Sequence, residues 1–192
     1  PTAPQVPAAS VEEPEIPTEP DVVETEPAII NPLTGEEVSE DCSAQRPYAI
    51  VLNNLEAALP QCGVSQADII YESLAEGGIT RMVAIFQDIS QAGTLGSIRS
   101  ARPYLIEYAL AYDAIFVHGG GSPQAYSDIA TKGVTAIDGV NGVLGTQAYY
   151  RDPDRMQNAG YEHSLFSSSD LFAQYIEPLD IRHEHEDGYH YT

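Results

Sequence analysis

Residues 96–104, GSIRSARPY, decide the fold because they join a strand to a helix and carry two of the chain's few basic residues. Residues 96–99 are typical of the end of a strand. Ser100 is a favourable helix cap, and Pro103 suits the first helical turn, where no backbone donor is needed. The apolar spacing that follows predicts a helix over residues 104–112. Its apolar side consists of Leu105, Ile106, Ala109 and Leu110.

Arg99 and Arg102 are therefore expected where a strand meets a helix N-terminus. Backbone N–H groups and the helix dipole favour an anion at such a place. The alternative is that both arginines pair with nearby carboxylates, because the formal net charge is -21 and structural ion pairs are common. The sequence leaves both interpretations open.

The composition excludes some classes of protein. A chain of 192 residues is long enough for one domain with a core, plus extra segments. Contacts to nucleic-acid phosphates need Lys and Arg, so the acidic balance argues against a nucleic-acid partner. No run of about eighteen apolar residues is present, so we expect contact with a membrane only through an anchor upstream of residue 1.

Three parts are expected along the chain. Residues 1–30 are rich in Pro and Glu, which oppose regular pairing and collapse, and they predict a disordered acidic tether. Residues 31–180 carry the domain. Residues 181–192 are interpreted as the start of a truncated second domain. Two histidines, His183 and His185, could share a face there, but no third ligand is well placed, so we predict no metal site and no cofactor.

The domain is predicted to be α/β, with a mixed central sheet and helices on both faces. Short apolar runs predict buried strands at 48–52, 114–118 and 134–137. Two more runs, within 68–88, are joined by two glycines and predict a β-hairpin; a helix over 66–75 is the alternative. Caps predict helices at 123–131, after Ser122, and from 168 or 169 to about 177. Residues 149–155 are expected to form a polar loop.

A two-residue hairpin turn fixes the expected register. Glu76 then faces Ile79, Leu74 faces Arg81, and Glu72 faces Val83. In this register Glu72, Glu76 and Arg81 share one face, where Arg81 can reach both carboxylates. They form either a cross-strand ion pair, which we favour, or the polar rim of a cleft.

A glycine-rich turn follows the strand that ends at His118. Gly119, Gly120 and Gly121 precede Ser122, where a helix begins. A strand, a glycine turn and a helix N-terminus form the general design of a phosphate cradle. The segment lacks the P-loop ending and the dinucleotide fingerprint, so a tight turn that needs glycine for its geometry is the alternative.

Cys42 and Cys62 stand on either side of the first strand. We expect them to lie close enough to pair if the protein is exported, and to be free thiols if it is cytosolic.

Several short motifs, taken in order, resemble the YerB-like family of bacterial lipoproteins, a domain of unknown function. The resemblance covers about residues 31–180. Its motifs are NPLTG (31–35), RPYAI (46–50), NN (53–54), PQCG (60–63), ADIIYE (67–72), EGGITR (76–81), IRSAR (98–102), HGGGSP (118–123) and EHS (162–164). The resemblance implies a protein tethered to the outer face of the bacterial cell membrane, with a lipid anchor, a tether, this domain and a smaller C-terminal domain. It implies no reaction.

The predicted function is that of a cell-envelope binding or scaffold protein with an arginine-lined anion site. Its partner would be a phosphate-bearing envelope ligand or another envelope protein. The alternative is an enzyme acting on a phosphate- or pyrophosphate-bearing envelope intermediate, with His118 or Glu72 as general base. A hydrolase using Ser122 beside His118 is a weaker third interpretation. The candidate ligand-binding residues are Arg81, Arg99, Arg102, Gly119, Gly120, Gly121, Ser122, Arg151, Arg155 and His163.

Overall fold

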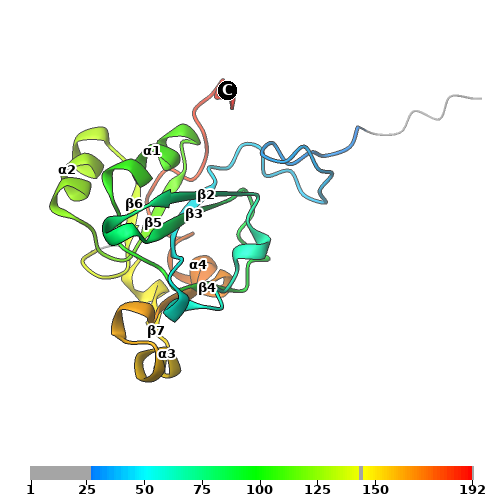
Figure 1. Cartoon of the computed structure of the whole chain (residues 1–192). Helices are drawn as coiled ribbons and strands as arrows, with labels where there is room; N and C mark the ends of the chain where they lie inside the picture. Colours follow the sequence, from blue (N-terminus) through cyan, green and yellow to red (C-terminus); the bar gives the residue numbers. More distant parts are fainter. Residues whose placement is uncertain (1–26, 143–144, 192) are drawn as a thin grey trace, which may run out of the picture.

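The computed structural model describes residues 27–142 and 145–191, so most of the predicted tether lies outside the described residues. It shows a mixed α/β domain with a five-stranded sheet, a three-stranded sheet and four α-helices (Figure 1). The strands are β1 (Tyr48–Asn53), β2 (Ile69–Leu74), β3 (Thr80–Phe86), β4 (Thr94–Gly96), β5 (Ile115–His118), β6 (Ala136–Asp138), β7 (Tyr150–Arg151) and β8 (Leu165–Ser168). The helices are α1 (Pro103–Ala111), α2 (Pro123–Lys132), α3 (Pro153–Asn158) and α4 (Ser169–Tyr175).

The central sheet has the strand order β2-β3-β1-β5-β6. β3 is antiparallel to both β1 and β2, whereas β1, β5 and β6 are parallel. β1 is buried along its whole length, as expected for an apolar strand in the middle of a sheet covered on both faces. The carboxyl ends of β1, β5 and β6 therefore lie at the same edge, where the candidate site is found.

Successive side chains along each strand point to opposite faces of the sheet, so each face packs into its own hydrophobic core. Ala49, Val51, Val83 and Ile85 face the layer of α1 and α2. Ile50, Leu52, Ala84 and Phe86 face the opposite layer, which includes Phe172 and Ile176 at α4 and Leu95 and Leu165 of the second sheet. Figure 1 shows α1 and α2 on one side of the sheet and α4 on the other. The predicted class, a mixed sheet with helices on both faces, is confirmed.

The hairpin is confirmed, but its expected register is wrong by one residue. Leu74 pairs with Thr80, and Arg81 pairs with Ser73. The turn contains three residues, Glu76–Gly78, closed by a bond from Ala75 N to Ile79 O. The extra turn residue shifts the pairing of the two strands by one position. Each side chain therefore lies on the opposite face of the sheet from the residue that it was expected to face. Arg81 therefore faces α1, and Glu72 lies on the opposite face of the sheet.

The start of α1 also differs from the expectation. Arg102, not Ser100, occupies the capping position and makes no side-chain capping bond, while Pro103 is the first helical residue. Ser100 Oγ instead donates to the carbonyl of Gly119 at 3.0 Å. Leu110, expected on the apolar side, is 39% exposed.

The second sheet, in the order β4-β8-β7, and helix α3 were not expected. Residues 149–155 are not a polar loop, because β7 occupies two of them and α3 begins at Pro153. The helix starts there because the Asp152 carboxylate accepts the backbone N–H of Arg155 at 2.8 Å and Pro153 needs no donor.

The expectation that Cys42 and Cys62 lie close enough to pair is wrong. Both are free. The carbonyl of Cys42 accepts a hydrogen bond from Gln87, which directly follows β3 at the end that lies opposite the first residue of β1. Cys62 instead forms a backbone bridge with Gly96, near the last residue of β1. A strand of six residues spans about 17–20 Å, well beyond the Cα separation of about 4.4–6.8 Å that a disulfide allows.

Residues 182–191 pack against the domain. Glu184 pairs with Gln45 as an isolated bridge, and Arg182 forms two bonds of 2.6 Å with the Asp113 carboxylate. His185 Nδ1 lies 3.0 Å from the same carboxylate. Across residues 27–142 and 145–191, no helix is long and apolar enough to cross a membrane.

Candidate functional site

A cavity of about 320 Å³ opens at the carboxyl end of β5, where the turn before α1 meets the second sheet. We call it the arginine cavity. It brings together predicted site residues from three separate segments: Arg99, Arg151 and the glycine turn 119–121. Its lining residues are Ile98, Arg99, Ser100, Gly119, Gly120, Gly121, Val140, Asn141, Arg151, Tyr161, Glu162 and Leu165.

Arg99 is fixed to the sheet through its backbone. Its N–H donates to Val51 O of β1, and its carbonyl accepts from Gly119 N. Its guanidinium donates from Nη1 to the backbone carbonyl of Glu162 at 2.6 Å, while Nη2 lies 3.5 Å from the Glu162 carboxylate. That carboxylate is 66% exposed, so the ion pair is a weak surface pair.

Arg151, at the end of β7, makes no ion pair with a carboxylate of the described residues. Its Nη1 donates to Tyr161 O at 2.8 Å, and its guanidinium lies 3.9 Å from the centroid of the Tyr161 ring. Only two buried side-chain polar atoms in the described part of the chain lack a partner, and neither belongs to Arg151. The remaining N–H groups of Arg151 therefore stay in contact with solvent.

The glycine turn is shaped by close packing. A Cβ on Gly119 would lie 2.3 Å from Leu165, and Gly120 has a φ of +77°. The Gly119 and Gly120 amides are already used, by Arg99 O and the Asp138 carboxylate. Ser122 caps α2 by accepting from Ala125 N at 3.2 Å. Two of the amides expected in a phosphate cradle, those of Gly119 and Gly120, are thus already bonded inside the protein.

Arg81 and Arg102 are not among the residues that line the arginine cavity. Both bind the carboxylate of Glu76, at the hairpin turn: Arg81 Nη2 lies 3.4 Å from Oε2, and Arg102 bonds both oxygens. Arg81 also donates to Ser100 O at 3.0 Å and is almost completely buried. The bond from Arg102 is the largest cause that lowers the pKa of Glu76 to about 2. This trio has the geometry of the structural ion pair that the sequence left open.

Arg155 and His163 have structural contacts as well. Arg155 donates to Leu59 O and Pro60 O at 3.0 and 2.6 Å, which ties α3 to a loop. His163 is buried and accepts at Nδ1 from the Asn53 amide at 2.7 Å. Its Nε2 therefore carries the proton and lies 3.4 Å from Glu162, the residue that also holds Arg99.

His118 borders a second cavity of about 280 Å³, which we call the histidine cavity. It lies on the other side of the glycine turn and shares Asn141 with the arginine cavity. The His118 ring is buried, which lowers its pKa, so the imidazole is neutral at pH 7. Asp138 was not among the predicted site residues; its carboxylate accepts hydrogen bonds from Gly120 N at 2.7 Å and from the Tyr126 hydroxyl at 2.6 Å. Its position at the end of the parallel strand beside β5 was the available signal.

Glu72 is separate from both cavities. Its carboxylate accepts from Asn54 at 2.8 Å and Thr80 at 2.6 Å on the edge strand β2. The two catalytic candidates, His118 and Glu72, therefore do not share a site.

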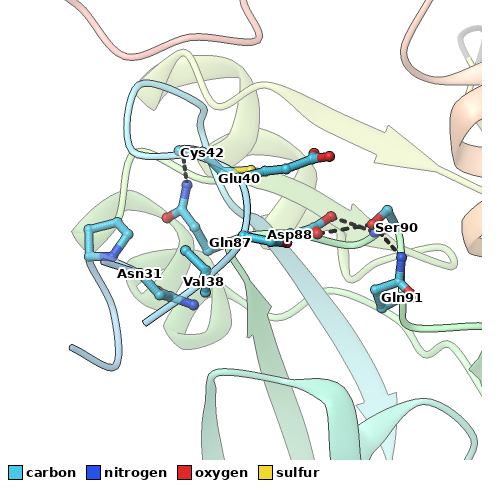
Figure 2. A pocket seen from close by; sticks show the side chains of 10 residues that line it. Asn31, Val38, Glu40, Cys42, Gln87, Asp88, Ser90 and Gln91 are labelled. Carbon is cyan, nitrogen blue, oxygen red and sulfur yellow. Dashed lines mark hydrogen bonds between the residues drawn. The ribbon is translucent and has the colours of Figure 1, made fainter. Parts of the chain in front are cut away.

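A larger cavity of about 450 Å³ lies at the opposite end of β1, between the N-terminal segment and the turn after β3 (Figure 2). Gln87 and Asp88 form one side of it, and Glu40 and Cys42 come from the N-terminal segment. The lining contains no Lys or Arg, so it offers nothing to neutralise an anion. Sequence analysis did not predict this cavity, because its walls come from separate segments, 31–42 and 87–91, whose contact is not evident from the sequence.

Comparisons with known proteins support the family resemblance. Residues 33–182 match the family described as the N-terminal domain of a protein of unknown function (DUF3048). The protein named "Putative lipoprotein YerB", from Bacillus subtilis (strain 168), is 39% identical over 134 residues, which are 69% of this chain and 40% of the relative. The crystal structure of the YerB protein from Bacillus subtilis matches with a TM-score of 0.71 and 34% identity, over 82% of this chain and 52% of that chain. The chain thus spans about half or less of the length of these relatives.

Proposed function

Because the chain belongs to the family of the DUF3048 N-terminal domain, we propose that it is the binding domain of a lipid-anchored protein on the outer face of the bacterial cell membrane. Its arginine cavity receives the anionic group of an envelope ligand, such as a phosphate or pyrophosphate. The observation that carries this proposal is that Arg99 and Arg151 line one cavity while backbone carbonyls, rather than carboxylates, make their hydrogen bonds.

A guanidinium held by a carbonyl keeps its full charge and most of its donors. Arg151 uses only Nη1, for Tyr161 O and a longer 3.4 Å contact to Ser164 Oγ, so Nε and Nη2 are available. Arginine binds phosphate oxygens through two parallel N–H groups, and such charge-assisted bonds are stronger than neutral ones. Two arginines around one cavity therefore favour a ligand with at least two anionic oxygens.

Two features oppose binding, and both are weak. The net charge of -21 repels anions at long range, but salt screens charges that lie more than about 8–10 Å away. The Glu162 carboxylate competes for Arg99, but it is mostly exposed and can turn into solvent at little cost. The local pair of arginines is therefore expected to dominate.

Thermal unfolding with added ligand tests the proposal. Phosphate, pyrophosphate and a polyprenyl phosphate are added in turn to the wild-type protein and to the variants Arg151→Ala and Arg102→Ala. A ligand at one hundred times its dissociation constant should stabilise the wild type by about 2.7 kcal/mol. The shift should disappear in Arg151→Ala and persist in Arg102→Ala, because Arg102 is bound to Glu76. The proposal fails if none of the three ligands stabilises the wild type.

One observation favours the alternative function, an enzyme acting on the same class of ligand. His118 is neutral, donates from Nδ1 to Gly120 O at 2.8 Å, and has no partner for Nε2 among the described residues. This is the arrangement of a general base beside an anion site. Turnover of a pyrophosphate ester by the wild type, lost in His118→Asn, would favour the enzyme. Binding without turnover would favour the receptor or scaffold.

A further inference from the structure

The histidine cavity and the arginine cavity are neighbours across the glycine turn. Asn141 lines both, and Gly121 separates Tyr126 on one side from Ala101 on the other, since a Cβ on it would lie 3.3 Å from the Tyr126 ring. A ligand whose anionic group is held by Arg151 can therefore extend past Asn141 into the histidine cavity.

The one carboxylate of the described residues that lines the histidine cavity, that of Asp138, already accepts hydrogen bonds from the protein. Asp138 Oδ1 accepts from Gly120 N and Val140 N at 2.7 and 2.8 Å, and Oδ2 accepts from the Tyr126 hydroxyl at 2.6 Å. These bonds keep the carboxylate ionised, although burial acts to raise its pKa. Among the described residues, the lining contains no Lys or Arg, so this cavity offers nothing to neutralise an anion.

Two acceptors remain free in this cavity. His118 donates from Nδ1, so its Nε2 carries a lone pair. In the described residues, Nε2 is not among the buried side-chain atoms that lack a hydrogen-bond partner. The Tyr126 hydroxyl gives its proton to Asp138, so the contact at 2.8 Å from Asn141 must be a donation from the Asn141 Nδ2. Asn141 Oδ1 is left as the second acceptor.

The rest of the lining is apolar or uncharged, and includes Ile129, Ala136 and the Tyr126 ring. Two free acceptors beside an apolar wall match a neutral group that carries hydroxyl or amide N–H donors on an apolar ring face. A bare phosphate has no apolar ring face. The two cavities together therefore match a ligand with an anionic end and a hydroxyl-bearing neutral end.

We infer that the histidine cavity is a second subsite, which binds the sugar ring of a sugar phosphate through His118 Nε2 and Asn141 Oδ1. This inference rests on the proposed function, because the phosphate is placed in the arginine cavity. His118 and Asn141 are then the residues that determine ligand specificity, and the arginines supply the charge.

The test compares two ligands by calorimetry: inorganic phosphate and glucose 1-phosphate, with glucose as the uncharged control. Glucose 1-phosphate should bind the wild type at least about fivefold more tightly than phosphate, the smallest gain expected from two hydrogen bonds to the ring. His118→Asn keeps a donor for Gly120 O and removes Nε2. Asn141→Ala removes Oδ1, and Asn158→Ala, on the exposed end of α3, is the matched control.

Both cavity variants should reduce the preference for glucose 1-phosphate to less than about threefold, while the Asn158 variant keeps the wild-type preference. His118→Asn should leave the affinity for phosphate unchanged, because His118 does not line the arginine cavity. The inference is overturned if the wild type binds both ligands equally, or if the variants weaken both ligands by the same factor. Failure of the wild type to bind even inorganic phosphate would instead contradict the proposed function. A polyprenyl-linked sugar phosphate in detergent separates the two sources of this chemistry: tighter binding than glucose 1-phosphate identifies a lipid-linked ligand, and equal binding a free one.

Discussion

Two pairs of arginines lie near the N-terminal end of α1, and their surroundings differ. Arg81 and Arg102 share the Glu76 carboxylate, and Arg81 is buried under the start of the helix. Arg99 and Arg151 line the arginine cavity and are positioned by the carbonyls of Glu162 and Tyr161. The first pair shares one carboxylate, whereas in the second pair only Arg99 has a carboxylate partner, the mostly exposed Glu162.

The difference shows that an arginine's partner decides its role. A carboxylate that binds two guanidiniums occupies the position a ligand would take. A carbonyl fixes the guanidinium and leaves the charge available. We therefore assign the first pair to stability and the second to binding. The following predictions test that division, starting with the largest effect.

Replacing Arg81 by Met should lower the free energy of unfolding by about 3 kcal/mol, because removing one partner of a buried polar network leaves the other unpaired. The group left unpaired is the Ser100 carbonyl, because Glu76 keeps its two bonds to Arg102. Arg102→Met should cost less than about 1 kcal/mol, because Glu76 is 59% exposed. Urea unfolding of both variants measures the difference. Equal losses would show that burial does not distinguish the two arginines.

Replacing Ser122 by Ala should lower the free energy of unfolding by about 1 kcal/mol, the usual effect of losing a helix cap. The affinity for phosphate should stay unchanged, because the hydroxyl is committed to Ala125 N. Ser127→Ala, on the exposed surface of the same helix, is the control for the loss of a hydroxyl. Weaker phosphate binding with unchanged stability would assign Ser122 to the site and not to the cap.

The Glu76 ion pair should give the smallest effect, and one that depends on pH. The bond from Arg102 helps to lower the pKa of Glu76 from 4.5 to about 2. A carboxyl group with a lowered folded-state pKa stabilises the fold above its unfolded value and loses this effect as the pH falls through the folded value. The stability difference between the wild type and Glu76→Gln should therefore be constant above about pH 5 and vanish between about pH 4.5 and 2. Its size should stay below about 1 kcal/mol, because the pair is exposed. A difference that grows on acidification would contradict the assigned pair.

Local signals predicted much of the fold. β1 and β5 are apolar runs, Ser122 and Ser168 cap α2 and α4 as expected, and two glycines mark the hairpin turn. The second sheet could not be predicted, because β4 has three residues and β7 has two. Strands this short carry no periodicity and exist only through their pairing with β8.

Part of the candidate site could also be predicted from the sequence. Arg99 and the glycine turn follow strand ends, so a shared edge could be expected from the sequence. The partners of the arginines could not, because the register of the hairpin depends on one extra turn residue and places Glu76 beside Arg102. The carbonyls that hold Arg99 and Arg151 belong to a short turn, Tyr161–His163, whose backbone direction has no sequence signature.

The central claim is that Arg99 and Arg151 bind an anion and Arg81 and Arg102 do not. The most direct measurement is the calorimetric affinity for pyrophosphate of the wild type, Arg151→Gln and Arg102→Gln at one salt concentration. Loss of a charge-assisted contact is worth roughly 1.5–3 kcal/mol, so Arg151→Gln should weaken binding by about 10- to 150-fold. Arg102→Gln should change it by less than about threefold, since an exposed pair contributes little. Equal loss in both variants, or loss only in Arg102→Gln, would contradict the account.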